Sequence, residues 1–190
     1  MNDQTPERPV PEQMTVDQYL PWAMAQGGRW ELIDGRPVKM PSETLFHVRV
    51  KAYVWLALMD AIEKSGLELH ALTDGATVRI DPRNANEPDC LVHAGPERPG
   101  EDLEIPDPVI VAEVVSPTSS KRDKVRKRAD YFSLPSVEHY LVVDPVERTV
   151  LHIRRADRPD DDGQLLREGD TLDLCPMVLQ VEVRRFFARH

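Results

Sequence analysis

Residues 109–115 read VIVAEVV, an almost wholly apolar run with one carboxylate, Glu113, inside it. A run of this kind is typical of a central β-strand that is buried on both faces of its sheet. Pro117 ends the run, and the hydroxyl residues after it can cap a helix, which we expect over residues 119–132. A further strand is expected at 138–143. The sequence around VIVAEVV therefore predicts strands and helices that share one sheet.

Two features near the N-terminus predict a short helix followed by a hairpin. Thr15 and Gln18 have the spacing of a helix capping box, so the helix is expected to begin there. Asp34 and Gly35 form the kind of pair that favours a tight turn between antiparallel strands. We therefore expect a hairpin made of the strands 29–33 and 36–40.

A longer helix is expected over residues 43–64, because apolar residues recur at every fourth position from Phe46 to Ile62. Gly66 supplies its stop. All of these elements together predict a mixed α/β fold, with one central β-sheet flanked by helices. The remaining strands are expected to be short and to lie at 67–72, 76–80, 89–93 and 149–154, with two more in the C-terminal tail.

Length and composition fit one globular domain. The chain has 190 residues, of which 41% are hydrophobic, so it can bury a core without disulfide or metal staples. Residues 1–13 are polar and rich in proline, and we expect a flexible arm there before a single domain over 14–190. Cys90 and Cys175 are far apart and lack CxxC spacing, which argues against a disulfide framework or a zinc ribbon.

The sequence shows no sign of membrane insertion or secretion. No apolar run reaches the length of a membrane span. The polar, acidic N-terminus lacks the basic start and apolar stretch of a signal peptide. We therefore expect a cytoplasmic protein with no membrane partner.

Charge is distributed unevenly along the chain. The formal net charge of −9 argues against a large non-specific nucleic-acid surface, because nucleic acids are polyanions. Residues 121–128, however, read KRDKVRKR, and six of these eight are Lys or Arg, out of 24 in the whole chain. This segment offers a local surface for a phosphate backbone; the alternative is an ordinary solvated helix face.

Glu113 and Asp89 are the main candidates for metal ligands. A carboxylate inside an apolar strand is costly unless a metal ion or a cationic side chain compensates it. The alternative for Glu113 is a buried salt bridge or a strand end that reaches solvent. Asp89 opens the run DCLV after Pro88, which taken alone is ordinary loop chemistry. Held on adjacent strands, the two carboxylates would make a hard oxygen site that suits Mg²⁺ and a substrate phosphate.

Several motifs taken together resemble one known family. The combination is similar to the Uma family, whose members are classed as restriction endonucleases in the PD-(D/E)XK nuclease superfamily. The resemblance runs roughly from Thr15 to Ile153, and it implies a restriction-endonuclease-like core. The motifs are RWELIDGRPVKM at 29–40, His47 early in the next helix, EPDCLV at 87–92, EVVSPTS at 113–119, D-x-x-x-K-x-x-x-Y at 123–131 and YLVVDP at 140–145.

The resemblance also implies the members of a catalytic site. Asp89 and Glu113 correspond to the metal ligands, and Glu31 is a further acidic member. The superfamily's lysine usually stands two residues after the glutamate, where this chain has Val115. The resemblance places a lysine on the following helix instead, which here is Lys127.

Other side chains are candidates for contacts with substrate. His47 can orient a phosphate or a water, or it can simply cap the helix at whose start it stands. Tyr131 shares a helix face with Lys127, because residues four apart are neighbours on a helix, and core packing is an alternative role for it. If that face looks toward the sheet, the outward residues of the same helix are expected to meet a nucleic-acid backbone. They include Lys121, Lys124 and Arg128.

These inferences predict a Mg²⁺- or Mn²⁺-dependent phosphodiesterase, with endonuclease activity on DNA as the expectation. A homodimer is a reasonable further expectation, since many nucleases that cut both strands work as dimers. The alternative is a non-catalytic nucleic-acid-binding or assembly module in which Glu113 is merely paired with Lys127. The acidic net charge and Val115 favour that alternative. The enzyme is favoured by the full set Glu31, Asp89, Glu113 and Lys127.

Overall fold

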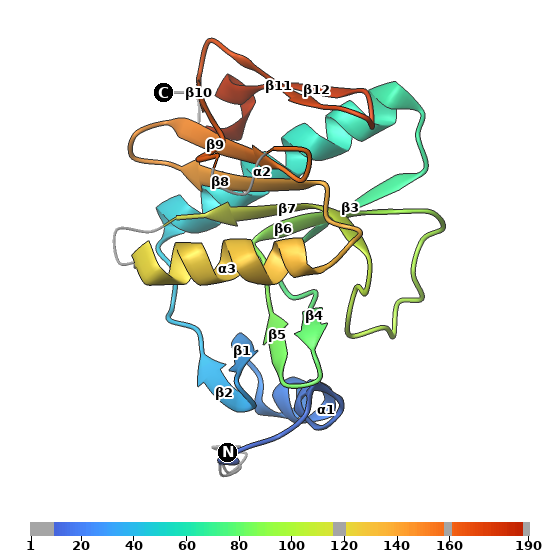
Figure 1. The fold of residues 1–190 in the computed structure, drawn as a ribbon, viewed down its shortest axis with the longest axis vertical. Helices are drawn as coiled ribbons and strands as arrows, with labels where there is room; N and C mark the ends of the chain where they lie inside the picture. The colour runs from blue at the N-terminus through green and yellow to red at the C-terminus, as the bar shows by residue number, and fades with distance from the viewer. Residues whose placement is uncertain (1–9, 116–120, 158–160, 188–190) are drawn as a thin grey trace, which may run out of the picture.

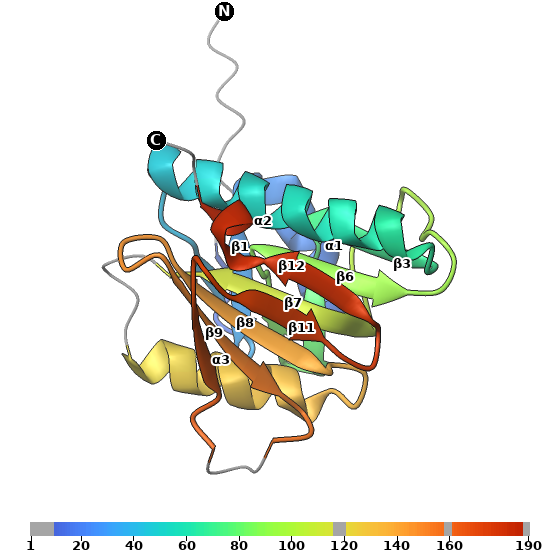
Figure 2. The same cartoon turned by 90° about the horizontal axis from the view of Figure 1, so that it is seen from above.

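Two helices, α2 (Leu45–Ser65) and α3 (Lys121–Ser133), cover opposite faces of a six-stranded sheet (Figures 1 and 2). The computed structural model describes residues 10–115, 121–157 and 161–187, and only the backbone of residues 121–124. The strand order is β10-β9-β8-β7-β6-β3. The strands are β3 (Leu69–Thr73), β6 (Cys90–Ala94), β7 (Pro108–Val114), β8 (His139–Asp144), β9 (Thr149–Arg154) and β10 (Gln164–Arg167).

β7 is a central strand, as its sequence predicts. It pairs antiparallel with β6 and parallel with β8. Parallel neighbours need a crossover connection, and α3 provides it. Ile110, Ala112 and Val114 pack in the core beneath α2, whereas Val111 packs in the core that contains Tyr131 of α3. Because strand side chains alternate, Glu113 shares the face of Val111 and points toward α3.

A second sheet lies beside the larger one, and α1 (Val16–Gln26) packs against it (Figure 1). The six-stranded sheet is the central sheet that the sequence predicts, and this second sheet is an addition to it. The strand of this sheet that the sequence does not predict is β5, which has only three residues and no apolar alternation to mark it. The order of the sheet is β2-β1-β5-β4, with β1 (Trp30–Ile33), β2 (Arg36–Lys39), β4 (Val78–Asp81) and β5 (Asn84–Asn86).

Local turn chemistry is confirmed where the sequence specifies it. Asp34 and Gly35, between β1 and β2, both have positive φ, at 51° and 78°. Gly66 closes α2 in the left-handed conformation. The tail holds one strand more than expected, and a short 3₁₀ helix stands where the terminal RRFF segment begins. These tail elements are β10, β11 (Thr171–Leu174), β12 (Leu179–Glu182) and η1 (Val183–Phe186).

The expected arm and domain boundary stay predictions, because residues 1–9 lie outside the described part of the chain. Within the described ranges, no helix combines the length and apolar character that crossing a bilayer requires. The expected cytoplasmic location likewise stays a prediction.

His139 and His152 form a buried pair on the neighbouring strands β8 and β9. Nδ1 of His139 lies 2.8 Å from Nε2 of His152, and both side chains are almost fully buried. Burial is the main cause that lowers the pKa of each imidazole to about 4, and the positive charge of Arg154 acts in the same direction. The folded protein therefore keeps both rings neutral.

We expect the free energy of unfolding to fall as pH drops from 6.5 toward 4. The pKa of both imidazoles is lower in the folded state, so the stability they contribute is present above the unfolded value of 6.5. This stability is lost below pH 6.5, because the histidines of the unfolded chain bind protons there while the folded pair stays neutral. Urea denaturation across this range should show a shallower pH dependence for His152→Gln than for the wild type. Identical pH dependence in the two proteins would contradict the assignment.

Candidate active site

Asp89 and Glu113 lie side by side where the two sheets meet. In the antiparallel ladder, Cys90 pairs with Ala112, so one further step of the register brings Asp89 opposite Glu113. The backbone N–H of Val114 donates to Oδ2 of Asp89 at 2.8 Å, which holds the aspartate against the end of β7. Both carboxylates are buried. Residues directly opposite in a ladder share one face of the sheet, and the role of these two as ligands of one ion stays a prediction.

Lys127 lies between two carboxylates. Its Nζ is 2.9 Å from Oε1 of Glu31 and 2.9 Å from Oε1 of Glu113. The hydroxyl of Tyr131, one turn later on α3, donates to the same oxygen of Glu113 at 2.7 Å. α3 thus brings an ammonium to the glutamate, whereas the usual strand position for the lysine is held by Val115, which is buried. The catalytic role of Lys127 remains to be tested.

Electrostatics set the charge states of Lys127 and Tyr131. Burial raises the pKa of Glu113 to about 7, against the opposing effect of the positive charge on Lys127. For Lys127 burial alone would lower the pKa, but the charges of Glu113 and Glu31 outweigh it and hold the pKa above the usual range. Burial also raises the pKa of Tyr131. Lys127 is therefore a permanent cation, and Tyr131 is a permanent hydrogen-bond donor.

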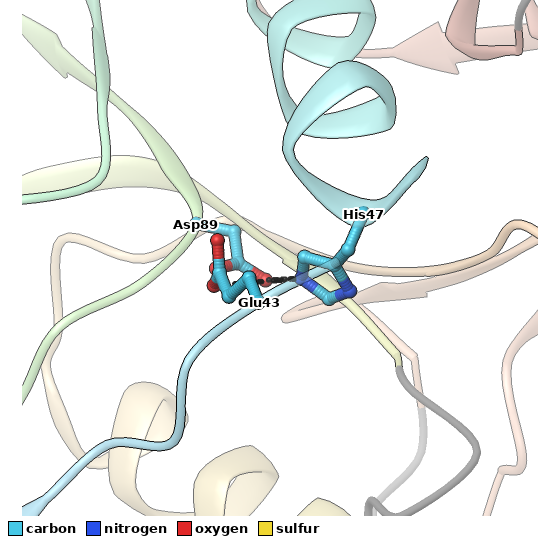
Figure 3. A group of neighbouring side chains, drawn as sticks. All are labelled: Glu43, His47 and Asp89. Atoms are coloured by element: carbon cyan, nitrogen blue, oxygen red, sulfur yellow. Dashed lines mark ion pairs between the residues drawn. The ribbon is translucent and has the colours of Figure 1, made fainter. Parts of the chain in front are cut away.

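A second group of side chains approaches Asp89 from the start of α2. Nε2 of His47 lies 3.5 Å from Oδ2 of Asp89 and 3.7 Å from Oε1 of Glu43. Figure 3 shows the two carboxylates and the imidazole gathered around one point. Each of the three offers one ligand atom, and these atoms all lie within 4.8 Å of one another. Thr44 caps α2 by accepting the N–H of His47 at 3.2 Å, which sets the place of this first turn.

Lys51 and its neighbours keep Asp89 ionised. Nζ of Lys51 is 2.6 Å from Oε2 of Glu43 and 3.4 Å from Oδ1 of Asp89. Burial by itself would raise the pKa of Asp89, but the hydrogen bond from His47, the charge of Lys51 and the N–H of Val114 together lower it. Asp89 is therefore a carboxylate at neutral pH.

Negative charge exceeds positive charge around this junction, among the residues that the structure describes. In the described part of the chain, four cationic side chains lie at the junction. Arg29 and Lys51 lie near Asp89, and Arg126 and Lys127 extend from α3. Carboxylates removed from water need compensating charge, and a bound cation is one way to supply it to the buried members of this group. The carboxylates that these four side chains contact are Glu31, Glu43, Asp74, Glu87, Asp89, Glu113 and Asp130.

Three residues of α3 are expected to contact the substrate, and the structure describes the side chain of one of them. The side chains of Lys121 and Lys124 lie outside the described part of the chain. Arg128 donates to the backbone carbonyl of Asp161 at 2.7 Å, so it serves a neighbouring loop in this structure.

Sequence reasoning missed two residues that a local pattern marks. Glu43 and Lys51 flank His47 with the four-residue spacing that also relates Lys127 to Tyr131. Lys51 moreover stands beside Val50 on the buried side of α2, where a charge requires an explanation. The four-residue spacing and the buried position of Lys51 together indicate that charged side chains gather at the start of α2.

Comparison with known proteins assigns the chain to a family. The Uma2 family model, described as "Putative restriction endonuclease", matches residues 16–185. The chain belongs to the Uma2 family. A solved structure from Anabaena variabilis ATCC 29413, described as "a putative nuclease belonging to DUF820", is similar with a TM-score of 0.67 and 16% identity. The match covers 91% of this chain and 97% of that one.

The comparison with curated proteins finds no match. The predicted resemblance and the α/β fold class are nonetheless confirmed by the family match and by the solved structure. Membership of Uma2 supports a nuclease-like function.

Lys127→Ala should destabilise this Uma2 protein by about 3–5 kcal/mol above pH 7, because it leaves two buried carboxylates without their shared cation. Arg128→Ala, on the same helix, is the matched control and should change stability by about 0.5 kcal/mol or less. Urea denaturation followed by circular dichroism measures both. Adding Glu113→Gln to Lys127→Ala should recover part of the loss. Equal effects of the two alanine variants would show that the ion pair is unimportant for folding.

Proposed function

We propose that the protein is a divalent-metal-dependent phosphodiester hydrolase, and that it acts on DNA as an endonuclease. The observation that carries the proposal is the convergence of Glu43, His47 and Asp89, in a junction that also holds the buried carboxylate of Glu113. Uma2 membership supports the nuclease class. The metal and the DNA substrate are the parts that this proposal adds.

The available ligand atoms fit Mg²⁺ and Mn²⁺. Carboxylate oxygens are the donors that both ions accept, and the imidazole of His47 is a better donor to Mn²⁺ than to Mg²⁺. Asp89 would hold the ion, either with Glu43 and His47 from the start of α2 or with Glu113 of β7. When bound, a divalent ion supplies the Lewis-acid charge that activates water and stabilises the oxygens of a phosphodiester.

The chain's own side chains would do the remaining work. The ammonium of Lys127 is fixed by Glu31 and Glu113, so it can donate to a phosphate oxygen without first being ordered. Tyr131 holds the carboxylate of Glu113 in place through its hydroxyl. His47, on the first turn of α2, keeps its ring beside Asp89 and positions that carboxylate.

A second candidate function is a non-catalytic nucleic-acid-binding module with the same fold. The ion pairs Lys127–Glu113 and Lys51–Asp89 favour it, because they already compensate both central carboxylates. In that case the carboxylates would have little affinity for an added ion.

Asp89→Asn should weaken metal binding and remove cleavage. It deletes the carboxylate that the pair Asp89–Glu113 shares with the group Glu43, His47 and Asp89. Calorimetric titration with Mn²⁺ should show a loss of affinity of about 10-fold or more. The cleavage assay uses supercoiled plasmid, single-stranded DNA and RNA, each with Mn²⁺ or with a chelator. Glu97→Gln, at an exposed position, is the matched control and should behave as wild type. Absence of both Mn²⁺ binding and cleavage in the wild type would favour the binding module.

Lys127→Met should lower the rate of cleavage by about 10²–10³-fold, the size of losing one donor to developing charge. Binding of Mn²⁺ should survive, since Asp89, Glu43 and His47 are untouched. The rate is measured at saturating Mn²⁺, on protein shown by circular dichroism to be folded. A cleavage rate equal to that of the wild type would remove Lys127 from the mechanism.

A further inference from the structure

The ammonium of Lys51 lies among three carboxylates. Its Nζ is 2.6 Å from Oε2 of Glu43, 2.6 Å from Oδ2 of Asp74 and 3.4 Å from Oδ1 of Asp89. The side chain of Lys51 is only 4% exposed. Lysine is almost never buried this deeply unless its charge is paired, so the three carboxylates are what keeps the ammonium inside the protein.

Two of these carboxylates also belong to the candidate ligand group at the start of α2. Nε2 of His47 lies 3.7 Å from Oε1 of Glu43 and 3.5 Å from Oδ2 of Asp89. Lys51 contacts the other oxygen of each acid. Figure 3 shows the two carboxylates next to each other, with the imidazole beside them. An ion held by Glu43, His47 and Asp89 therefore has to share both acids with the ammonium.

An ammonium and a divalent ion compete for ligands of this kind. Carboxylate oxygens stabilise both, and two cations held close together repel each other. Burial alone would lower the pKa of Lys51, but the charge of Asp89 and the hydrogen bonds to Asp74 and Glu43 raise it above its usual value. Lys51 is therefore a cation at neutral pH, and it compensates Glu43 and Asp89 when no ion is bound.

Asp74 is the partner of Lys51 that lies outside the ligand group. It belongs to the segment between β3 and β4, and its side chain is 30% exposed. Arg29 approaches the same oxygen of Asp74 at 3.3 Å, so two cations hold this carboxylate in place. When a divalent ion takes Glu43 and Asp89, Asp74 still offers the ammonium a counter-charge. Lys51 can therefore give up two partners without becoming a buried, unpaired charge.

We propose that Lys51 sets the affinity of this site for a divalent ion. Its ammonium is the counter-charge of Glu43 and Asp89 when no ion is bound, and an ion has to displace it from both. The protein then loads metal only when the concentration of the free ion is high enough to outweigh that contact. This role of Lys51 rests on the proposed function, because it assumes that Glu43, His47 and Asp89 hold the metal.

Lys51→Met tests the competition by calorimetric titration with Mn²⁺. The variant should bind Mn²⁺ at least about 10-fold more tightly than the wild type, because it lacks both the competing ammonium and a like charge beside the ion. Arg126→Met is the matched control. It removes a cation from the same junction, but the carboxylates that this cation contacts, Glu31 and Asp130, are outside the ligand group. An equal gain in both variants would overturn the proposal, since net charge alone would then set the affinity.

The other outcomes separate the role of Lys51 from the proposed function. If the wild type binds Mn²⁺ and Lys51→Met binds it equally or more weakly, the role of Lys51 is overturned and the metal site stands. If neither protein binds Mn²⁺, both are overturned. Binding by Lys51→Met alone would support the proposal, because the ammonium then excludes the ion from the wild-type site.

A measurement on the wild type covers the case in which Lys51→Met does not fold. NMR of lysine-labelled protein can follow the ammonium groups of Lys51 and Lys64 during a titration with Mg²⁺, which is diamagnetic. The resonance of Lys51 should shift, because the ion takes two of its three carboxylate partners. Lys64 is exposed on the same helix and paired with Asp60, so its resonance should stay in place. An unmoved Lys51 resonance at the end of the titration would overturn the proposal.

Discussion

The ammonium of Lys127 joins three parts of the molecule. It extends from α3, and it pairs with Glu31 of the smaller sheet and with Glu113 of the larger one. All three charged groups are buried, so each is costly without the other two. The position of α3 on its sheet, and the seating of the smaller sheet against both, are therefore linked to one ion-paired group. The same three side chains therefore hold the fold together and form part of the candidate active site.

Two helices serve two neighbouring carboxylates from opposite faces of the sheet. α2 brings His47 and Lys51 to Asp89, and α3 brings Lys127 and Tyr131 to Glu113. Each helix does so with residues one turn apart. The two environments drive the carboxylates in opposite directions, since the pKa of Asp89 is lowered and that of Glu113 is raised. Unequal neighbours of this kind are what allows adjacent acids to take different roles.

The sequence predicts those parts of the site that a short stretch of consecutive residues marks. The strand β7 and the cost of Glu113 within it follow from seven consecutive residues. Lys127 follows from the family resemblance, because no spacing rule alone leads from Val115 to a helix. Glu43 and Lys51 were within reach of helical periodicity, since they repeat the spacing about His47. For each of these, the pattern lies in one short stretch of chain.

Other features that sequence reasoning missed depend on contacts between distant parts of the chain. β5 has only three residues, and its place in a second sheet depends on pairing with β1, far earlier in the chain. Arg29 contacts Glu87 across 58 residues, with no local pattern at either end. Pairings of this kind are decided by how the two sheets pack, and periodicity along the chain does not reveal them.

Sequence separation leads us to expect an order of assembly for the site. Glu113 and Lys127 are 14 residues apart, within one strand–helix unit, whereas Arg126 and Glu31 are 95 residues apart. Closing the longer loop costs more chain entropy, and contacts of high sequence separation form slowly. During synthesis Glu31 emerges long before Arg126 and Lys127, so it stays unpaired until α3 has been made. A growing chain therefore holds an incomplete set of charges. The set is complete only when the smaller sheet has packed against α3.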